Sequence, residues 1–262
     1  MSLSFSRLSA YRTCPRQFEY EYIKKLPRQI RAGESFGSSV HNTLKKWGER
    51  EIAVSGKRQA GIDQLRLFTQ EDSAHHLPLA VETLLEFWHS SFIVEGYGTR
   101  VEADMARLRG EEIMQYFFDW WQQREHDVLF VEKGFSLAVD GQKITGRLDR
   151  VEKVEGGLKI IDYKTSAVRS QNQADADLQL SVYALACEQS LKQPCSELSF
   201  LFLSEEGVTE VVTARTAGQL QDAAKQIRLL EECITSGDFR PTPGREVCRC
   251  CPYSNVCDVA AV

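Results

Sequence analysis

The chain has 262 residues, of which 42% are hydrophobic and 26% are charged, and its formal net charge is −5. This length suits one large domain with a sizeable core, and the composition excludes a disordered chain or a fibrous protein. No apolar run approaches the roughly 20 residues that a membrane helix needs. No signal-peptide pattern opens the chain. We therefore expect a soluble, cytoplasmic protein without a membrane partner.

The charges are distributed unevenly along this acidic chain. Residues 1–31 carry seven basic residues against two acidic ones, whereas acidic residues crowd the middle of the sequence. A basic zone on an acidic protein is typical of a surface that attracts nucleic-acid phosphates, although each residue could also belong to a solvated helix face. The candidate nucleic-acid contacts in this zone are Arg7, Arg12, Arg16, Lys24 and Lys25.

The first part of the chain predicts helices over residues 4–11, 16–25 and 36–50. Cys14 and Pro15 separate the first two, because proline suits the first position of a new helix. Aromatic residues of the second helix lie among basic ones, so they could stack on single-stranded bases or pack in the core. In the third helix His41 lies one turn after Gly37, and a lone helical histidine is usually structural.

Residues 51–128 predict a helical insertion that covers the core or docks a partner protein. Two stretches, 78–92 and 101–123, show the apolar stripes of amphipathic helices. The polar stretch 69–76, with His75 and His76, is predicted to be a loop.

The second half of the chain predicts most of a sheet. Strands at 128–139 and 142–154 are joined by Asp140 and Gly141, which strongly favour a hairpin. A third strand, 158–163, follows a glycine-rich turn. The remaining predicted elements are a polar loop to 173, a helix over 175–189, strands over 197–203 and 208–213, and a helix over 217–235 that ends before Gly237.

Two aspartates and a lysine gather on neighbouring predicted strands. Asp162 and Lys164 are two residues apart and therefore share a face, and hairpin pairing can bring Asp149 opposite them. Two carboxylates at one place are costly unless a cation neutralises them, and such sets are usually functional. A surface ladder of ion pairs is the alternative. Glu132 could reach the same place, but we expect it to face solvent.

The order of these motifs resembles the PD-(D/E)XK nuclease superfamily. More narrowly it resembles the RecB-like branch, which includes the nuclease domain of AddB and the CRISPR-associated RecB-like exonucleases. The resemblance is carried by Gly37-Ser-Ser-Val-His41, Gly146-x-x-Asp149, Asp162-x-Lys164, Gln179-x-x-x-Tyr183 and the cysteines. It implies a single α/β domain over residues 1–262, with a restriction-endonuclease-like core of a mixed central sheet flanked by helices.

The resemblance also implies the roles of the site residues. The expected metal ligands are His41, Asp149, Asp162 and the backbone carbonyl of Tyr163. Carboxylates suit Mg²⁺ or Mn²⁺, and a histidine ligand shifts the preference towards Mn²⁺. Lys164 would orient or activate the attacking water. Gln179 and Tyr183 would contact the DNA backbone or a metal-bound water.

An iron–sulfur cluster is implied as well. Cys248, Cys251 and Cys257 place three thiolates on one loop, and Cys14 would be the fourth ligand, so that residues 1–31 and 240–262 bind the cluster together. Zinc sites usually draw two local pairs of ligands, whereas this split of one and three fits the 4Fe–4S cluster of the family. Zinc stays an alternative.

The other cysteines have different expected roles. Cys250 offers a second register for the ligand set. The remaining three are expected to be buried small hydrophobic residues: Cys187, Cys195 and Cys233.

The implied function is that of a metal-dependent DNA nuclease. Relatives in this branch degrade single strands from their ends, often with 5′-to-3′ polarity, in DNA repair, recombination or CRISPR adaptation. The implied partners are single-stranded DNA or DNA ends, together with a helicase or a CRISPR adaptation protein. A non-catalytic DNA-end-binding module and a zinc-stabilised interaction domain are the alternatives. The intact aspartates and lysine favour the enzyme.

Overall fold

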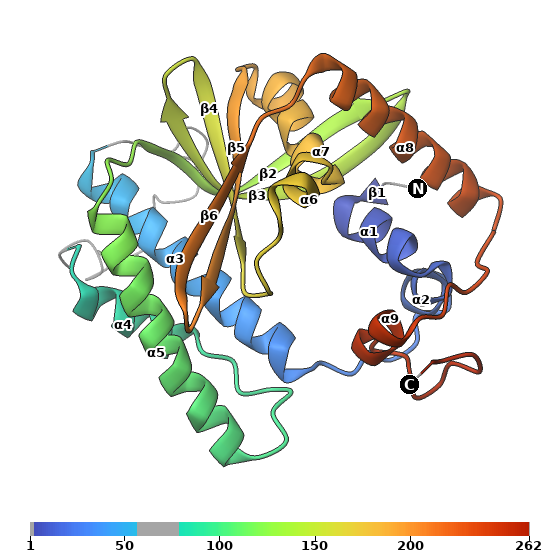
Figure 1. Cartoon of the computed structure of the whole chain (residues 1–262), viewed down its shortest axis with the longest axis horizontal. Helices are drawn as coiled ribbons and strands as arrows, with labels where there is room; N and C mark the ends of the chain where they lie inside the picture. Colours follow the sequence, from blue (N-terminus) through green and yellow to red (C-terminus); the bar gives the residue numbers. More distant parts are fainter. Residues whose placement is uncertain (1–2, 57–78, 262) are drawn as a thin grey trace, which may run out of the picture.

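A computed structural model of the chain describes residues 3–56 and 79–261. A mixed sheet of six strands crosses the molecule and helices cover it (Figure 1). The strands are β1 (Leu3–Ser4), β2 (Val128–Val139), β3 (Gln142–Val154), β4 (Gly157–Lys164), β5 (Cys195–Ser204) and β6 (Gly207–Thr213). The predicted fold class is therefore confirmed. The predicted loop at His75 and His76 lies outside the described residues.

Strand β3 organises the sheet. It pairs antiparallel with β2 along most of its length, parallel with the short β1, and antiparallel with β4 from Arg150 to Val154. The predicted β2–β3 hairpin is confirmed, and both turn residues, Asp140 and Gly141, adopt the positive φ angles that such a two-residue turn requires. Strand β5 then pairs parallel with β4 and antiparallel with β6.

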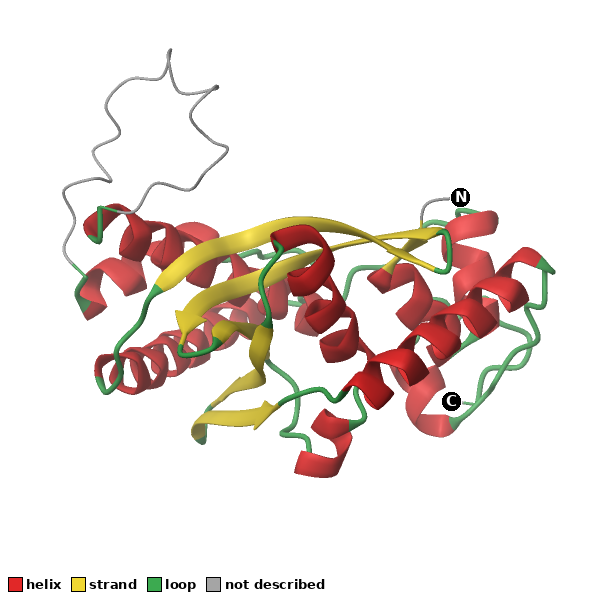
Figure 2. Cartoon of the chain, turned by 90° about the horizontal axis from the view of Figure 1, so that it is seen from above, coloured by secondary structure: helices red, strands yellow, loops and turns green. Residues whose placement is uncertain are grey.

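The helices form two layers, one on each face of the sheet (Figure 2). Helices α3 (Ala32–Val54), α4 (Val81–Ser91) and α5 (Arg100–Gln122) bury their apolar stripes with Ile161, Tyr163 and Leu201 of the sheet. The other layer contains α1 (Phe5–Thr13), α2 (Pro15–Phe18), α7 (Leu178–Ala186) and α8 (Ala217–Thr235). The shorter elements are α6 (Gln171–Asp175), α9 (Arg245–Cys250) and the π-helical turns η1 (Glu19–Ile23) and η3 (Cys187–Leu191).

Several predicted helix boundaries are wrong. The helix predicted over 36–50 runs from Ala32 to Val54 as α3. The predicted loop before 173 contains α6, because Ser170 and Gln173 form a capping box that starts a helix there. The helix predicted over 175–189 begins only at Leu178, where Asp177 is the N-cap residue and accepts hydrogen bonds from two backbone amides.

The two ends of the chain lie side by side. Figure 1 shows α1 and α2 beside α9 and the last residues. Thr242 donates a hydrogen bond to the carbonyl of Thr13 (3.1 Å), and Arg31 donates to the carbonyls of Arg249 and Cys251 (2.6 Å each). Phe18 and Tyr20 are buried, so of the two predicted roles, stacking on bases or packing in the core, the second is correct for these two residues. Among the described helices, none is long and apolar enough to cross a membrane.

A buried ion network joins α3 to β3. The guanidinium of Arg150 is 2% exposed and donates to both oxygens of Glu51 on α3 and, at 2.6 Å, to Glu152 on its own strand. His126 contacts the same oxygen of Glu152 (3.0 Å), which accounts with Arg150 for a pKa of Glu152 near 2 despite the opposing effect of burial. Each charge is therefore paired, as burial requires.

Replacing Arg150 tests this network. Arg150→Met leaves Glu51 and Glu152 buried without their cation, and removing one partner of a buried pair typically costs about 3–5 kcal/mol. We expect the free energy of unfolding in urea to fall by this amount. Lys153→Met, at an exposed position of the same strand, should change it by less than about 0.5 kcal/mol. Equal losses in both variants would contradict the assignment.

Candidate metal site and its polar network

The candidate site lies where β3 and β4 separate. Their backbone pairing reaches Arg150 and Ile161, and the next residues are Asp149 and Asp162. Beyond this point the amide of Tyr163 donates to the side chain of Asp149 (3.0 Å) instead of to the backbone of β3. The two aspartates therefore lie at adjacent strand positions, as the hairpin pairing predicted.

Helix α3 brings His41 to these strands. The ring nitrogen Nδ1 of His41 lies 3.4 Å from Oδ2 of Asp149, and Nε2 lies 3.1 Å from the carbonyl oxygen of Tyr163. Burial lowers the pKa of His41, but the hydrogen bond and charge of Asp149 outweigh it, so that the pKa is raised overall. Three of the four predicted ligand groups thus lie in direct contact: His41, Asp149 and the carbonyl of Tyr163.

Glu132 corrects one prediction. Its side chain is only 17% exposed, so it does not face solvent as expected. One ligand atom each from His41, Glu132 and Asp149 lie within 4.8 Å of one another. Among the described residues, these three side chains form the group that could hold a metal ion. Glu132 therefore belongs to the candidate site.

Asp162, on the neighbouring strand β4, lies in a network of hydrogen bonds. Its Oδ1 accepts from Gln179 (2.8 Å) and from the hydroxyl of Tyr183 (2.9 Å), and its Oδ2 lies 2.5 Å from Nζ of Lys164. Lys164 also donates to Oε1 of Gln179 (3.0 Å). Four of the predicted site residues therefore contact one another around a carboxylate that is 2% exposed.

The oxygen Oδ2 of Asp162 is the least satisfied atom of this network. It is buried and receives no hydrogen bond of good geometry from the described residues, so the ion pair with Lys164 is its close contact. Burial raises the pKa of Asp162 to about 6, against the opposing charge of Lys164 and with the help of Asp149. A buried oxygen of this kind, near His41 and Asp149, fits a hard divalent cation.

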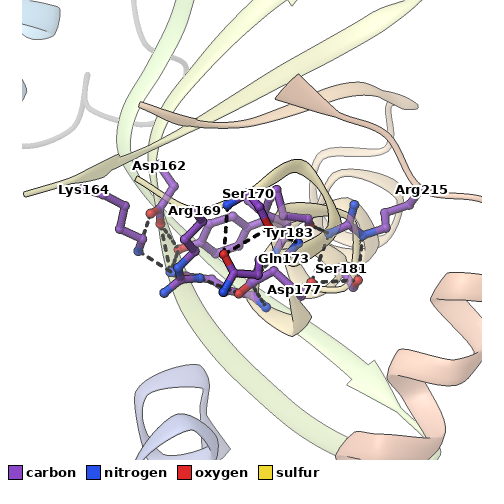
Figure 3. A network of polar contacts seen from close by, with 12 residues as sticks. Asp162, Lys164, Arg169, Ser170, Gln173, Asp177, Ser181, Tyr183 and Arg215 are labelled. Carbon is purple, nitrogen blue, oxygen red and sulfur yellow. Dashed lines mark hydrogen bonds and ion pairs between the residues drawn. The ribbon is translucent and has the colours of Figure 1, made fainter. Parts of the chain in front are cut away.

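A second network holds the helix that carries Gln179 and Tyr183 (Figure 3). Arg215 donates to the carbonyls of Ala174 (2.8 Å) and Asp177 (3.1 Å) and to the hydroxyl of Ser181 (2.8 Å). Arg169 forms an ion pair with Asp177 at 2.7 Å. These contacts fix the start of α7 and thereby the side chains that it points at Asp162.

Gly146 supports the same helix from the sheet. A Cβ atom at this position would lie 2.4 Å from Cζ of Phe135, so only glycine leaves room for that ring. Phe135 in turn packs edge-to-face against Tyr183, with 6.1 Å between the ring centroids. The motif glycine therefore acts through packing.

The cysteines form a separate cavity at the joined chain ends. Its lining includes the sulfur-bearing residues Cys14, Cys248, Cys251 and Cys257, together with Tyr20 and Pro241. Burial raises the pKa of Cys251, and the three other thiols of the cavity raise it further. The pKa of Cys14 is lowered, because hydrogen bonds from Thr242 and from nearby backbone amides outweigh the effect of burial.

The remaining cysteines differ from the predictions in part. Cys250 is exposed and does not line the cavity. Cys187 is buried as predicted, whereas Cys195 and Cys233 are only half-buried. Cys248 lies on α9 and not on a loop.

The basic zone is partly neutralised within the chain. Arg16 and Lys24 both form ion pairs with Glu19, at 3.2 and 3.0 Å. The guanidinium of Arg7 lies over the ring of Tyr22, 5.0 Å from its centroid. Arg12 and Lys25 are exposed. The zone borders the cysteine cavity, because Arg16 also lines it.

A model of the PD-(D/E)XK nuclease superfamily matches residues 2–258. This chain belongs to the PD-(D/E)XK nuclease superfamily. The predicted restriction-endonuclease-like core agrees with this PD-(D/E)XK membership and with the six-stranded mixed sheet.

Other proteins are similar to this PD-(D/E)XK chain over nearly its full length. The gene 69 protein of Mycobacterium phage L5 is 24% identical over 290 residues, which cover 98% of this chain and 96% of the phage protein. The gene 69 protein of Mycobacterium phage D29 is 23% identical over 269 residues, with 98% and 96% covered. The crystal structure of a candidate exonuclease from Eubacterium rectale covers 100% of this chain and 91% of its own, at 13% identity and a TM-score of 0.49.

The sequence held a signal for Glu132 that the prediction did not use. A two-residue turn at 140 and 141 pairs Val139 with Gln142. Counting back along both strands from this pair puts Glu132 opposite Asp149. Arg215 carried no such signal, because the groups that it binds at α6 and α7 lie more than 30 residues away in the sequence.

The raised pKa of Asp162 predicts a pH-dependent stability for the metal-free protein. A carboxyl whose pKa rises on folding stabilises the fold below its unfolded pKa, 3.8, and this contribution is lost as the pH rises through about 6. Thermal unfolding with EDTA should show wild type losing stability relative to Asp162→Asn over this range. Parallel curves for the two proteins would show that Asp162 titrates normally.

Proposed function

We propose that this protein is a metal-dependent DNA nuclease with the RecB-like arrangement of active-site groups. The observation that carries the proposal is that the His41–Asp149 pair and the Asp162–Lys164 pair lie at adjacent positions, where β3 and β4 separate. These residues come from three separate segments of a chain that belongs to a nuclease superfamily. We infer hydrolysis of phosphodiester bonds.

The donor set fits Mg²⁺ or Mn²⁺. Asp149, Asp162, His41 and the carbonyl of Tyr163 would hold the ion, with hard oxygens that suit both metals and an imidazole that favours Mn²⁺. When bound, such an ion would supply Lewis-acid polarisation of the phosphate and a lower pKa for a coordinated water.

The neighbouring side chains would orient the reactants. Lys164 is proposed to orient or activate the attacking water, since its ammonium lies beside Asp162 and reaches Gln179. Gln179 and Tyr183 both donate to Asp162 and so fix the direction of its carboxylate. Their helix is itself held by Arg215 and Asp177, which makes the arrangement rigid.

The proposed substrate is single-stranded DNA or a DNA end, degraded as an exonuclease. The residues proposed to contact phosphates are Arg7 on α1, Arg12 on α1 and Arg16 on α2, together with Lys24 and Lys25, which directly follow η1. Such contacts bind without base specificity and weaken with salt. The 5′-to-3′ polarity, the role in repair, recombination or CRISPR adaptation, the helicase or CRISPR adaptation partner and the cytoplasmic location stay predictions from the sequence.

A 4Fe–4S cluster is proposed for the cysteine cavity. The support is the convergence of Cys14 with Cys248, Cys251 and Cys257 on one cavity, with Cys250 turned outwards. When bound, the cluster would crosslink residues 1–31 to residues 240–262. The crosslink would close the loop between Cys14 and Cys248. A disulfide that closes a loop of this span stabilises a fold by about 5 kcal/mol, and we use it as the analogue for the cluster.

Active-site variants test the nuclease proposal. Asp149→Asn, Asp162→Asn and Lys164→Met should each reduce cleavage of end-labelled single-stranded DNA by more than about a hundredfold, because each removes a charge from the reacting centre. Mg²⁺ and Mn²⁺ are compared at equal concentration, and circular single strands are tested to separate exonuclease from endonuclease activity.

The matched control is Asp222→Asn, an exposed carboxylate on α8. It should cleave at the wild-type rate. Near wild-type cleavage by any of the three active-site variants would overturn the assignment.

Cysteine variants test the cluster. Serine at Cys14, Cys248, Cys251 or Cys257 should remove the absorbance at about 400 nm from anaerobically purified protein. It should also lower the melting temperature. Cys250→Ser and Cys233→Ser should keep both, because neither residue lines the cavity. A colourless wild-type protein with one zinc per chain would contradict the cluster, and full colour in Cys14→Ser would contradict the crosslink.

A further inference from the structure

Glu132 occupies an unusual backbone position next to the proposed metal site. Its neighbours Val131 and Lys133 pair with Arg150 and Leu148, which puts Glu132 directly across from Asp149. Its φ angle is +49°, although it lies within β2 and is not a glycine. Left-handed backbone at a non-glycine residue is strained and persists where the surrounding structure imposes it, most often at functional sites.

The charge pattern does not account for this position in the absence of a cation. Two carboxylates directly opposite each other on paired strands repel. Arg147 offsets part of this, since its Nη1 lies 3.1 Å from Oε2 of Glu132, but the Arg147 side chain is 67% exposed. An exposed ion pair of this kind contributes little to stability. The ion pair with Arg147 therefore does not explain the strain and the repulsion at Glu132.

Two independent features of the site indicate a divalent cation. Ligand atoms of Glu132, His41 and Asp149 lie within 4.8 Å of one another, a spacing that one ion can bridge. Beside them, the buried Oδ2 of Asp162 has no well-formed hydrogen bond and lies against Lys164. The side chain of Glu132 lies on the side of His41 and Asp149, as expected of a residue directly across from Asp149.

We propose that Glu132 supplies a further carboxylate ligand to the ion held by His41 and Asp149. This inference rests on the proposed function, because it adds a donor to that same metal site. A third carboxylate beside Asp149 and Asp162 would raise the negative charge of the site and strengthen its affinity for a divalent cation. The alternative is that Glu132 serves only as the ion-pair partner of Arg147.

Titration calorimetry with Mn²⁺ separates the two roles. Glu132→Gln keeps the side-chain shape but removes the charge, and we expect its Mn²⁺ affinity to fall by at least about tenfold, since even residues that only support a ligand contribute about 10–100-fold. The matched control is Arg147→Gln, which breaks the ion pair and leaves the carboxylate. It should bind Mn²⁺ as tightly as wild type or more tightly.

Melting temperatures give a second measure that does not depend on activity. With EDTA, Glu132→Gln should melt at or above the wild-type temperature, because the repulsion from Asp149 is gone. The rise in melting temperature on adding Mn²⁺ should be smaller than in wild type. If Glu132→Gln melts lower with EDTA and binds Mn²⁺ normally, Glu132 is only an ion-pair partner and the inference is wrong.

Asp149→Asn distinguishes failure of this inference from failure of the proposed function. Loss of Mn²⁺ binding in both Asp149→Asn and Glu132→Gln supports the ligand role. Loss in Asp149→Asn alone removes Glu132 from the site and keeps the nuclease proposal. Unchanged binding in both variants would overturn the metal site itself.

Discussion

The buried guanidinium of Arg150 sets the geometry on which the candidate site depends. It binds Glu51 of α3 with two hydrogen bonds and Glu152 of β3 with a third. Asp149 immediately precedes Arg150 on β3, and His41 lies on the same helix as Glu51. This ion network therefore fixes Asp149 and His41, two of the metal-ligand candidates, relative to each other. A purely apolar contact between helix and strand could slide, whereas a fully buried charge has one satisfactory arrangement.

His41 and Lys164 offset part of the negative charge of the candidate site in the absence of a metal ion. His41 contacts Asp149, and Lys164 contacts Asp162. A divalent ion would be attracted to both positions. The pKa of His41 is raised by Asp149 and that of Asp162 is raised by burial, so both groups keep their protons to a higher pH than usual. A metal ion would therefore compete with protons and with Lys164 for the same oxygens, which links its affinity to pH.

The sequence was informative where local chemistry decides the structure. The Asp140–Gly141 turn predicted the β2–β3 hairpin. The glycine-rich turn at residues 155–157 predicted the pairing of β3 with β4, which puts Asp149 and Asp162 at adjacent positions. Helix α6 was missed and α7 was predicted to begin too early, because Asp177 begins a new helix and Arg215, from a distant segment, stabilises the break before it. Arg150 and Glu51 are 99 residues apart, and no periodicity in the sequence relates them.

Helix α3 connects the two ends of the chain to the candidate metal-site residues. Arg31 precedes its first residue and donates hydrogen bonds to the carbonyls of Arg249 and Cys251 beside the cysteine cavity. His41 lies ten residues further along the same helix, about 15 Å at the helical rise. A helix transmits a displacement along its axis with little loss, because its backbone hydrogen bonds are continuous. The position of the C-terminal cysteine segment and the position of His41 are therefore set by one rigid element.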